Sequence, residues 1–309
     1  MTKAAGGSQV QGSGPGEQGS VASGLVIVDK PQGLTSHDVV ARIRRLAGTR
    51  RVGHAGTLDP MATGVLVIGV EKATRLLGHL ALSEKEYSAT IRLGQATDTD
   101  DAEGQVIAQT SAAAVSQSSL EAAVAALTGE IEQVPPGYSA IKVAGKRAYR
   151  LARQGAAPEL AARSVTVTAF TVRAVRRAGD LLDADVTVTC SSGTYIRALA
   201  RDLGRALGVG GHLTALRRTR VGPYEIAGAA TLDQLATRFT VIPLAEAAAA
   251  AFPRRELSAA EAAKVSHGAR LPALGLGSGP VAAFGPDGTL VALLTEEADQ
   301  ARSLAVFVP

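Results

Sequence analysis

One carboxylate, Asp59, stands in a short glycine-rich segment directly before an apolar run. The segment reads Gly53-His54-Ala55-Gly56-Thr57-Leu58-Asp59-Pro60-Met61-Ala62-Thr63-Gly64, and Val65-Leu66-Val67-Ile68 follows it. Proline at position 60 favours an extended backbone at Asp59, and glycine lets a chain approach other groups closely. An acid held on a tight turn at a strand edge suits a nucleophile or a base. The alternative is an Asp-Pro turn that only joins two elements.

Further motifs follow this segment in a fixed order. The run from Gly56 to Leu66 resembles the signature of the TruB family of tRNA pseudouridine synthases. The other matching blocks are Asp29-Lys30-Pro31-Gln32-Gly33, Lys85-Glu86-Tyr87, residues 92–104, residues 135–142 and Ser192-Gly193-Thr194-Tyr195-Ile196-Arg197. The resemblance runs from about residue 24 to about residue 244. It implies an enzyme that isomerises the uridine at position 55 in the T arm of tRNAs, with Asp59 as its catalytic aspartate.

The implied reaction needs no cofactor. It breaks an N-glycosidic bond, turns the uracil and rejoins it through C5, without redox change or energy input. The sequence contains no phosphate-binding Gly-x-x-x-x-Gly-Lys-[Ser/Thr] loop and no dinucleotide fingerprint, and its five histidines and one cysteine lack metal-ligand spacing. We therefore expect neither cofactor nor metal. The reaction does need an anionic group near the sugar–base junction, and whether Asp59 attacks the uracil ring or the anomeric carbon stays open.

Two further residues are implied to take part in catalysis. A carboxylate in a dry pocket needs a cation to stay ionised, and the resemblance makes Arg197 that cation. The alternative is that Arg197, Arg201 and Arg205 form one solvated helix face, which we favour for Arg201 and Arg205 only. The resemblance makes Tyr87 a base-stacking residue and a candidate proton acceptor, whereas an edge-strand aromatic is the alternative.

The resemblance also implies five substrate-binding residues, each with a structural alternative. His54 would replace the flipped base in the RNA loop, and its alternative is a surface group. Tyr195 would contact the flipped nucleotide or pack at a helix start, and Leu216 would line the pocket or belong to the core. Lys30 would be buried near Tyr87 or exposed at a strand end, and Asp101 would lie near the active site or belong to an acidic turn.

Basic residues form three clusters in a chain of net charge +4. They are Arg42, Arg44, Arg45, Arg50 and Arg51; Lys142, Lys146, Arg147, Arg150 and Arg153; and Arg217, Arg218 and Arg220. A single cluster is usually a solvated face, but three clusters beside one catalytic loop indicate a cleft that follows phosphates. We expect RNA backbone contacts from Arg42, Arg44, Arg45, Lys142, Arg147, Arg217 and Arg218.

Apolar periodicity predicts the elements that position these residues. Strands are expected at residues 24–30, 65–70, 87–93, 165–175 and 181–190, and helices at 119–127, at 149–154, after a Ser36 cap and after Gly193. Because helices interrupt the strands without a regular βαβ period, the predicted class is α+β: a mixed, mainly antiparallel central sheet flanked by helices. Under the resemblance this is the pseudouridine synthase fold. Cys190 ends an alternating run and is expected to be a buried strand residue.

Composition divides the chain into three parts. Residues 1–22 are rich in glycine, serine and glutamine and are expected to form a disordered leader. Residues 23–250 form the expected catalytic domain, and an alanine-rich linker helix lies between Pro243 and Pro253. Residues 251–309 predict a small β-rich domain, which the resemblance makes a PUA-like RNA-binding module. A single cysteine, no signal peptide and no apolar run of about 18 residues favour a cytoplasmic protein that binds no membrane.

Two rival functions stay open. One is a guide-dependent archaeal or eukaryotic relative, which would need partner-protein and guide-RNA surfaces. The other is a tRNA-binding chaperone with secondary catalysis. The segment Gly137-Tyr138-Ser139-Ala140-Ile141-Lys142 favours a stand-alone bacterial enzyme, and the intact set of Asp59, Tyr87 and Arg197 favours activity. We expect the T stem-loop of tRNA as partner, no obligate protein partner, and a monomer.

Overall fold

The computed structural model describes residues 22–137, 142–143, 146–147 and 160–308. The helix expected at 149–154 and the leader up to residue 21 lie outside these residues. Among the described residues, no helix is both long enough and apolar enough to cross a membrane.

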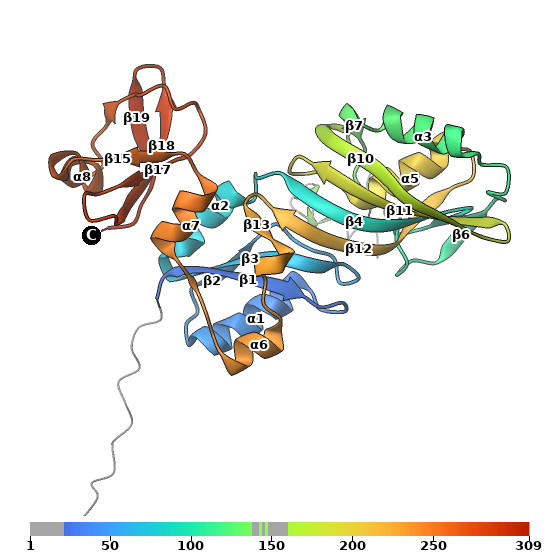
Figure 1. Cartoon of the computed structure of the whole chain (residues 1–309), viewed down its shortest axis with the longest axis horizontal. Helices are drawn as coiled ribbons and strands as arrows, with labels where there is room; N and C mark the ends of the chain where they lie inside the picture. The colour runs from blue at the N-terminus through green and yellow to red at the C-terminus, as the bar shows by residue number, and fades with distance from the viewer. Residues whose placement is uncertain (1–21, 138–141, 144–145, 148–159, 309) are drawn as a thin grey trace, which may run out of the picture.

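One large sheet runs through the molecule (Figure 1). Its order is β14 (Ile242–Pro243), β1 (Gly24–Lys30), β3 (Thr63–Val70), β12 (Gly211–Val221), β4 (Lys85–Leu93), β11 (Leu181–Cys190), β10 (Arg163–Ala178) and β7 (Gly129–Gln133), with β2 (Val52–Ala55) on β3 and β13 (Tyr224–Glu225) on β12. Its pairs are antiparallel except that of β3 with β12, which is parallel and joins Thr63 to Arg217 and Gly64 to Arg218. The predicted mixed, mainly antiparallel sheet is confirmed.

Buried and less buried side chains alternate along β4 and β11. In β4 the side chains of Tyr87, Ala89 and Ile91 are buried and their neighbours less so. Strand β11 alternates in the same way and ends at Cys190, which is buried as predicted. Successive strand residues point to opposite faces, so Tyr87 faces the core side. Strands β1 and β3 are buried almost throughout.

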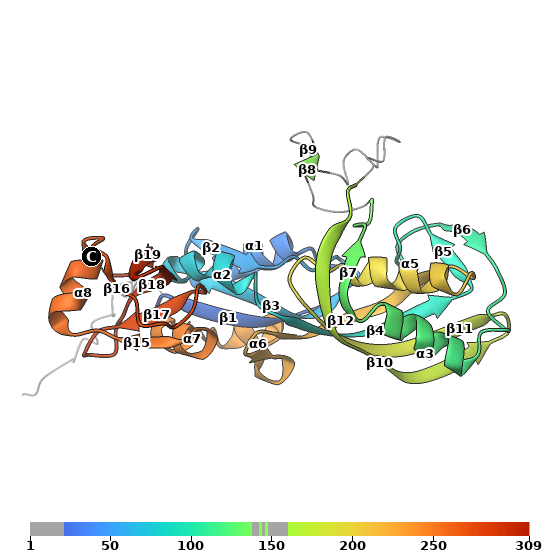
Figure 2. The ribbon, with the colours of Figure 1, turned by 90° about the horizontal axis from the view of Figure 1, so that it is seen from above.

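Helices cover the sheet at both ends. Figures 1 and 2 show α3 (Gln117–Ala126) and α5 (Ile196–Ala206) beside β10 and β11, and α1 (Ser36–Ala47) and α6 (Leu232–Thr237) near β1. Apolar residues of these helices join one core with the sheet, among them Ile43 of α1, Leu120 of α3 and Leu203 of α5. The 3-10 helix η1 (Glu71–Leu76) and the short α2 (Leu77–Leu80) follow β3.

The start of α1 differs from the prediction by one residue. Thr35, and not Ser36, is the cap: its hydroxyl accepts a hydrogen bond from the Asp38 N–H, and the Asp38 carboxylate accepts one from the Thr35 N–H at 2.9 Å. This reciprocal arrangement requires an acid three residues after the cap. Asp38 stands there for Thr35, whereas Val39 stands there for Ser36. The Ser36 hydroxyl is thereby left for another contact.

Two small hairpins extend from the sheet. Strands β5 (Gln95–Thr97) and β6 (Val106–Gln109) form one, and β8 (Lys142–Val143) and β9 (Lys146–Arg147) form the other. Figure 2 shows β8 and β9 at the top of the view, apart from the large sheet.

The C-terminal part is β-rich, as predicted. After the turn η2 (Ile226–Gly228) and the linker helix α7 (Leu244–Ala251), five strands form a second sheet in the order β15 (Arg254–Glu256), β17 (Val281–Phe284), β18 (Leu290–Glu297), β19 (Gln300–Val306) and β16 (Leu271–Pro272), with α8 (Ala259–Ser266) beside it. Phe284 and Phe307 share an apolar cluster with Ile27 of β1 and Val67 of β3. The two sheets therefore pack through a common core.

Candidate active site

The turn that carries Asp59 is fixed on both sides. The Ala62 N–H donates to the Asp59 carbonyl at 3.1 Å and closes the turn. The Ser36 hydroxyl accepts from the Leu58 N–H at 2.9 Å and donates to the Leu58 carbonyl at 3.1 Å. Because Ser36 is only 1% exposed, this contact is shielded from water. The backbone before and after Asp59 is therefore held in one position.

Lys30 stabilises the same turn through hydrogen bonds from its ammonium group. Its side chain is fully buried, and not exposed at a strand end. Its ammonium donates to the carbonyls of Pro31, Leu34 and Pro60 at 3.0, 2.7 and 3.3 Å. Burial lowers the pKa of Lys30 to about 8, and the nearby Asp59 carboxylate opposes that shift. At neutral pH the ammonium is therefore still charged and able to donate all three hydrogen bonds.

Arg218 does not lie where a phosphate contact was predicted. Its side chain is 1% exposed. Its Nε donates to the Val65 carbonyl at 2.7 Å and its Nη2 to the Gly56 carbonyl at 3.1 Å. The short parallel pairing of β12 with β3 explains the difference, because it places residue 218 directly against Gly64, where any Cβ would lie 2.2 Å from the Arg218 carbonyl oxygen. Arg218 fixes the Asp59 loop and does not face solvent.

Residues that are distant in sequence meet around one cavity of about 270 Å³. Five of the predicted catalytic and substrate-binding residues line it: Asp59, Tyr87, Tyr195, Arg197 and Leu216. Arg218 and Lys85 complete its basic side. The Lys85 ammonium donates to the carbonyls of Ala81 and Ser83, and burial lowers its pKa to about 8. A concave site lined by convergent polar groups is the usual form of an enzyme active site.

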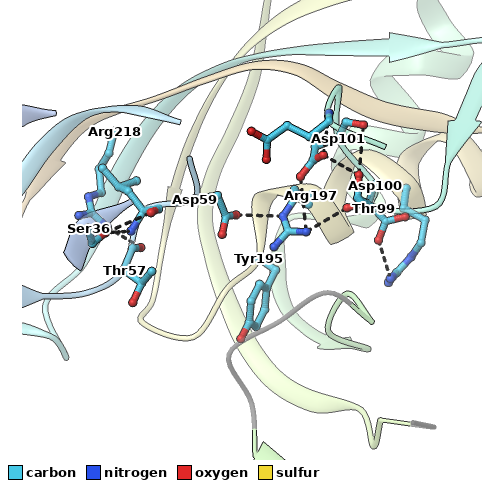
Figure 3. A network of polar contacts seen from close by, with 12 residues as sticks. Ser36, Thr57, Asp59, Thr99, Asp100, Asp101, Tyr195, Arg197 and Arg218 are labelled. Atoms are coloured by element: carbon cyan, nitrogen blue, oxygen red, sulfur yellow. Dashed lines mark hydrogen bonds and ion pairs between the residues drawn. The ribbon is translucent and has the colours of Figure 1, made fainter. Parts of the chain in front are cut away.

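Asp59 and Arg197 form an ion pair at this cavity (Figure 3). The Arg197 Nε lies 3.0 Å from the Asp59 Oδ2. Arg197 stands in the first turn of α5 and its side chain is 5% exposed, whereas that of Asp59 is 37% exposed. Charged groups attract more strongly where water is excluded. The buried guanidinium therefore holds the carboxylate at the cavity while leaving it accessible.

Asp101 lies behind Arg197 and outside the cavity lining. Its Oδ2 is 3.5 Å from the Arg197 Nη1, which also donates to the Thr99 carbonyl at 2.9 Å. Its Oδ1 accepts from the Thr99 hydroxyl at 2.6 Å and the Glu103 N–H at 3.0 Å. Figure 3 shows Asp59 and Asp101 approaching the guanidinium from different sides. Asp101 belongs both to an acidic turn and to the site, so the two alternatives for it are compatible.

The next acid, Asp100, is partly buried beside a different arginine. Its Oδ2 lies 3.3 Å from the Arg201 Nη1. Burial raises the pKa of Asp100 to about 6, and the charges of Arg201 and Arg197 oppose this shift. Arg201 is therefore not simply part of a solvated helix face, as was favoured from the sequence, because its side chain is 21% exposed and occupied by this contact.

Tyr87 and Leu216 form the apolar wall of the cavity. Tyr87 is 7% exposed and Leu216 is 8% exposed. Burial raises the pKa of the Tyr87 hydroxyl, while the charge of Arg218, its partner across the strands, acts in the opposite direction. At neutral pH Tyr87 is thus a neutral phenol with a flat apolar face.

His54 lies on β2 and is not part of the cavity lining. Its ring packs edge to face with that of His37, with the ring centres 5.6 Å apart. Burial, followed by the charges of His37 and Arg218, lowers the pKa of His54. The imidazole is therefore uncharged at neutral pH.

The remaining predicted RNA contacts differ in accessibility. Arg42, Arg44 and Arg45 are exposed on α1, although the Arg44 Nη2 also donates to the Val52 carbonyl at 3.0 Å. The Arg217 side chain is 40% exposed and pairs with Asp29 at 2.7 Å. Arg42 and Arg217 border a shared cavity of about 350 Å³. The side chains of Lys142 and Arg147 lie outside the described part of the structure.

Ser36 and Lys85 are among the supports of the site that sequence reasoning missed. The side chains of both residues form hydrogen bonds with backbone groups that the fold brings close, and no local sequence pattern predicts such a contact. The Thr35-Ser36 pair was a partial signal for Ser36, because one hydroxyl is enough to cap a helix. Among the described residues no group of three or more histidine, cysteine or acidic side chains could hold a metal.

Three family models match this chain in consecutive segments between residues 44 and 308. The family model described as TruB family pseudouridylate synthase (N terminal domain) matches residues 44–196. The model described as tRNA pseudouridylate synthase B C-terminal domain matches residues 197–249, and that described as tRNA Pseudouridine synthase II, C terminal, matches residues 252–308.

Curated relatives match almost end to end. The chain is 64% identical to the tRNA pseudouridine synthase B of Thermobifida fusca (strain YX) over 291 residues, which is 93% of this chain and 99% of the relative. It is 62% identical to the protein of the same name from Arthrobacter sp. (strain FB24), covering 93% of this chain and 97% of the relative.

Solved structures agree on the fold. A chain from a Cbf5-Nop10-Gar1 complex superposes with a TM-score of 0.71 at 28% identity, covering 94% of this chain and 85% of the other. A chain from an H/ACA RNP bound to a substrate RNA containing 2'-deoxyuridine gives a TM-score of 0.70 at 27% identity, covering 93% and 85%. The expected pseudouridine synthase fold is confirmed. From its sequence, its fold and its relatives, the chain belongs to the TruB family of tRNA pseudouridine synthases.

Proposed function

We propose that this protein converts the uridine at position 55 in the T arm of tRNAs to pseudouridine, without guide RNA, cofactor or protein partner, as a cytoplasmic monomer. The observation that carries the proposal is the ion pair of Asp59 and Arg197 in the lining of a cavity of about 270 Å³. An accessible carboxylate on a rigid turn, beside a buried cation, meets the requirements of a nucleophile in this chemistry.

Asp59 is the proposed nucleophile. The N1–C1′ bond of the uridine breaks and the C5–C1′ bond forms, while a proton leaves C5 and one is gained at N1. Attack of the carboxylate on either the uracil ring or the anomeric carbon would hold one fragment while the base turns. Arg197 pairs with Oδ2 of Asp59, and a carboxylate that pairs through one oxygen keeps the other for the substrate.

The target base must leave its stack before this can happen. A paired or stacked uracil hides its glycosidic bond from a protein side chain, and enzymes of this kind take the base into a pocket. The flat Tyr87 ring, with Tyr195 and Leu216 around it, suits a planar pyrimidine. In this proposal the Tyr87 phenol gives its own proton towards N1 and, as phenolate, takes the proton that leaves C5, so that its hydroxyl is restored. His54, an uncharged ring near the same loop, is proposed to fill the place that the base leaves.

Phosphate contacts would hold the T stem-loop. The exposed Arg42 and Arg45 of α1 and the half-exposed Arg217 of β12 support this part of the proposal. Within the described part of the structure Arg42 and Arg45 form no salt bridge, whereas Arg218 is buried and donates to the carbonyls of Val65 and Gly56.

The test is a reaction of the purified protein alone with an unmodified tRNA transcript, followed by mapping of pseudouridine along the chain. We expect product at position 55, in the presence of EDTA, and none in a transcript with cytidine at that position. Product only after addition of a guide RNA and partner proteins would support the guide-dependent rival. Tight tRNA binding without product would support the chaperone.

A further inference from the structure

A single glutamine side chain contacts both the N–H and the carbonyl of the residue that precedes α5. Gln133, at the end of β7, is 1% exposed. Its Oε1 accepts from the Tyr195 N–H at 2.8 Å, and its Nε2 donates to the Tyr195 carbonyl at 3.1 Å. The two residues are 62 positions apart in the sequence, so the contact joins two separate elements.

The backbone at Tyr195 explains why a primary amide fits. Tyr195 has φ −100° and ψ 112°, an extended conformation. In extended backbone the N–H and carbonyl of one residue point to the same side, as they do towards a neighbouring strand. An amide side chain presents one donor and one acceptor side by side, and so replaces a strand partner for this one residue.

The same contact determines where α5 begins. Tyr195 is the N-cap residue of α5, and its side chain makes no capping hydrogen bond. Its carbonyl also accepts the first hydrogen bond of the helix, from the Leu199 N–H at 3.2 Å. Gln133 therefore fixes the peptide from which the first turn starts, and that turn contains Arg197.

A second contact joins α5 to the same strand end. The Arg201 Nη2 donates to the carbonyl of Val134, the residue after Gln133, at 2.8 Å. Arg201 stands one turn beyond Arg197. The helix is therefore attached to the end of β7 at two successive turns, on either side of the residue that pairs with Asp59.

We propose that Gln133 is a positioning residue for the Asp59–Arg197 pair. Its amide holds the Tyr195 peptide, and through it the start of α5, so that the Arg197 guanidinium reaches Asp59 and the Tyr195 ring stays at the cavity. Gln133 is not among the residues that line the cavity. The inference rests on the proposed roles of Asp59 and Arg197 and adds the residue that aligns them.

Three variants test this role. Gln133→Leu removes both hydrogen bonds at similar volume. Gln133→Glu keeps the acceptor, and it regains a donor only when its carboxyl is protonated. Glu132→Gln, an exposed neighbour on the same strand, is the matched control. For each variant the single-turnover rate on tRNA, the Kd for tRNA and the Tm are measured between pH 5.5 and 8.5.

We expect Gln133→Leu to lose turnover by about 10²-fold, because small displacements of catalytic groups have effects of this size, with Kd within about twofold of the wild type. Burial raises a carboxyl pKa. The rate of Gln133→Glu relative to wild type should therefore be close to one at the acid end and fall as pH rises. Glu132→Gln should behave as wild type. A wild-type rate for Gln133→Leu, or a ratio for Gln133→Glu that does not change with pH, would overturn the proposal.

A readout independent of turnover separates this inference from the proposed function. The Nε–H of Arg197, observed by ¹⁵N NMR, should exchange slowly with water in the wild type and lose that protection in Gln133→Leu. Unchanged protection in a folded Gln133→Leu variant would contradict the positioning role. If wild type fails to modify tRNA but the protection is lost as expected, the proposed function fails and the role of Gln133 stands.

Discussion

The Nη1 of Arg197 lies 3.5 Å from the Asp101 carboxylate, on the same guanidinium whose Nε contacts Asp59. One buried cation therefore pairs with two acids of very different accessibility, since the Asp101 side chain is 4% exposed and that of Asp59 is 37% exposed. The buried acid orients the arginine, and the arginine orients the accessible acid. The accessible carboxylate is the one proposed for chemistry, and the buried one is the acid that can only align the arginine.

Replacing Asp59 by asparagine tests the nucleophile. Asp59→Asn keeps the shape of the side chain but removes its charge, so tRNA binding should stay within about threefold and turnover should fall below detection, at least about 10³-fold. Binding and single-turnover assays measure the two effects. Asp299→Asn, an exposed aspartate of the C-terminal sheet region, is the control. Turnover by Asp59→Asn near the wild-type rate would remove Asp59 from the mechanism.

Tyr87 separates stacking from proton transfer. Tyr87→Phe keeps the flat ring and should bind tRNA as wild type does while turning over at least about 10²-fold more slowly, because the hydroxyl is lost. Tyr87→Ala removes the ring as well and should also weaken binding, since stacking contributes about 1–3 kcal/mol per base. Equal binding and rate constants for the two variants would show that the ring face contributes nothing.

Arg218 should act through the position of the Asp59 loop. Arg218→Met leaves the buried carbonyls of Gly56 and Val65 without its hydrogen bonds, each at a cost of about 1–3 kcal/mol. We expect a lower Tm and strongly reduced turnover. Arg218→Lys keeps the charge but not the forked geometry, so its activity should be intermediate. Arg205→Met, on the exposed part of α5, is the control. If Arg218→Met changes only the salt dependence of tRNA binding, then its first predicted role was correct.

The salt dependence of binding tests the α1 surface. Log Kd should vary linearly with log salt, and neutralising Arg42 and Arg45 together should lower affinity and reduce the slope by about two. The control is Arg176→Gln with Arg205→Gln, because Arg176 already pairs with Asp185. An unchanged slope for the α1 variant would mean that this face of the helix does not meet phosphates.

Asp100 should make stability depend on pH. Its pKa in the folded protein is about 6, above the ordinary value of 3.8. Between these values the folded chain keeps a proton that the unfolded chain releases, so the free energy of unfolding falls as pH rises from about 4 to about 6. Asp100→Asn cannot titrate, and asparagine tolerates the left-handed backbone at this position, where φ is 60°. Its Tm relative to wild type should therefore rise over this range by a few degrees, on the order of 5 °C. A constant difference in Tm would contradict the shifted pKa.

Local patterns predicted the framework of the fold well. Alternation indicated β4 and β11, and helical spacing indicated α1 and α5, because these signals arise within one element. The strand β12, which carries Leu216 and Arg218, was not predicted. Its run of arginines and threonines is polar, and it is a strand because β4 pairs along nearly its whole length.

The candidate site was predictable to the extent that motifs carry it. Motif resemblance selected Asp59, Tyr87 and Arg197, and the fold brings all three to one cavity. It could not distinguish Arg217 from Arg218, since adjacent residues of a strand face opposite sides and the register decides which one is buried. Gln133 had no signal either, because its partner is a peptide group and any residue could have supplied one.

The shared core of the two sheets has a consequence for how the chain is made. Ile27 and Val67, on the paired strands β1 and β3, are covered by Phe284 and Phe307. The chain is synthesised from its N-terminus at about 5–20 residues per second, so the covering residues emerge on the order of tens of seconds after the strands they cover. During that interval an apolar strand face stays open to solvent and to chaperones. The apolar packing of β1 and β3 is therefore complete only after residues 284 and 307 have been synthesised.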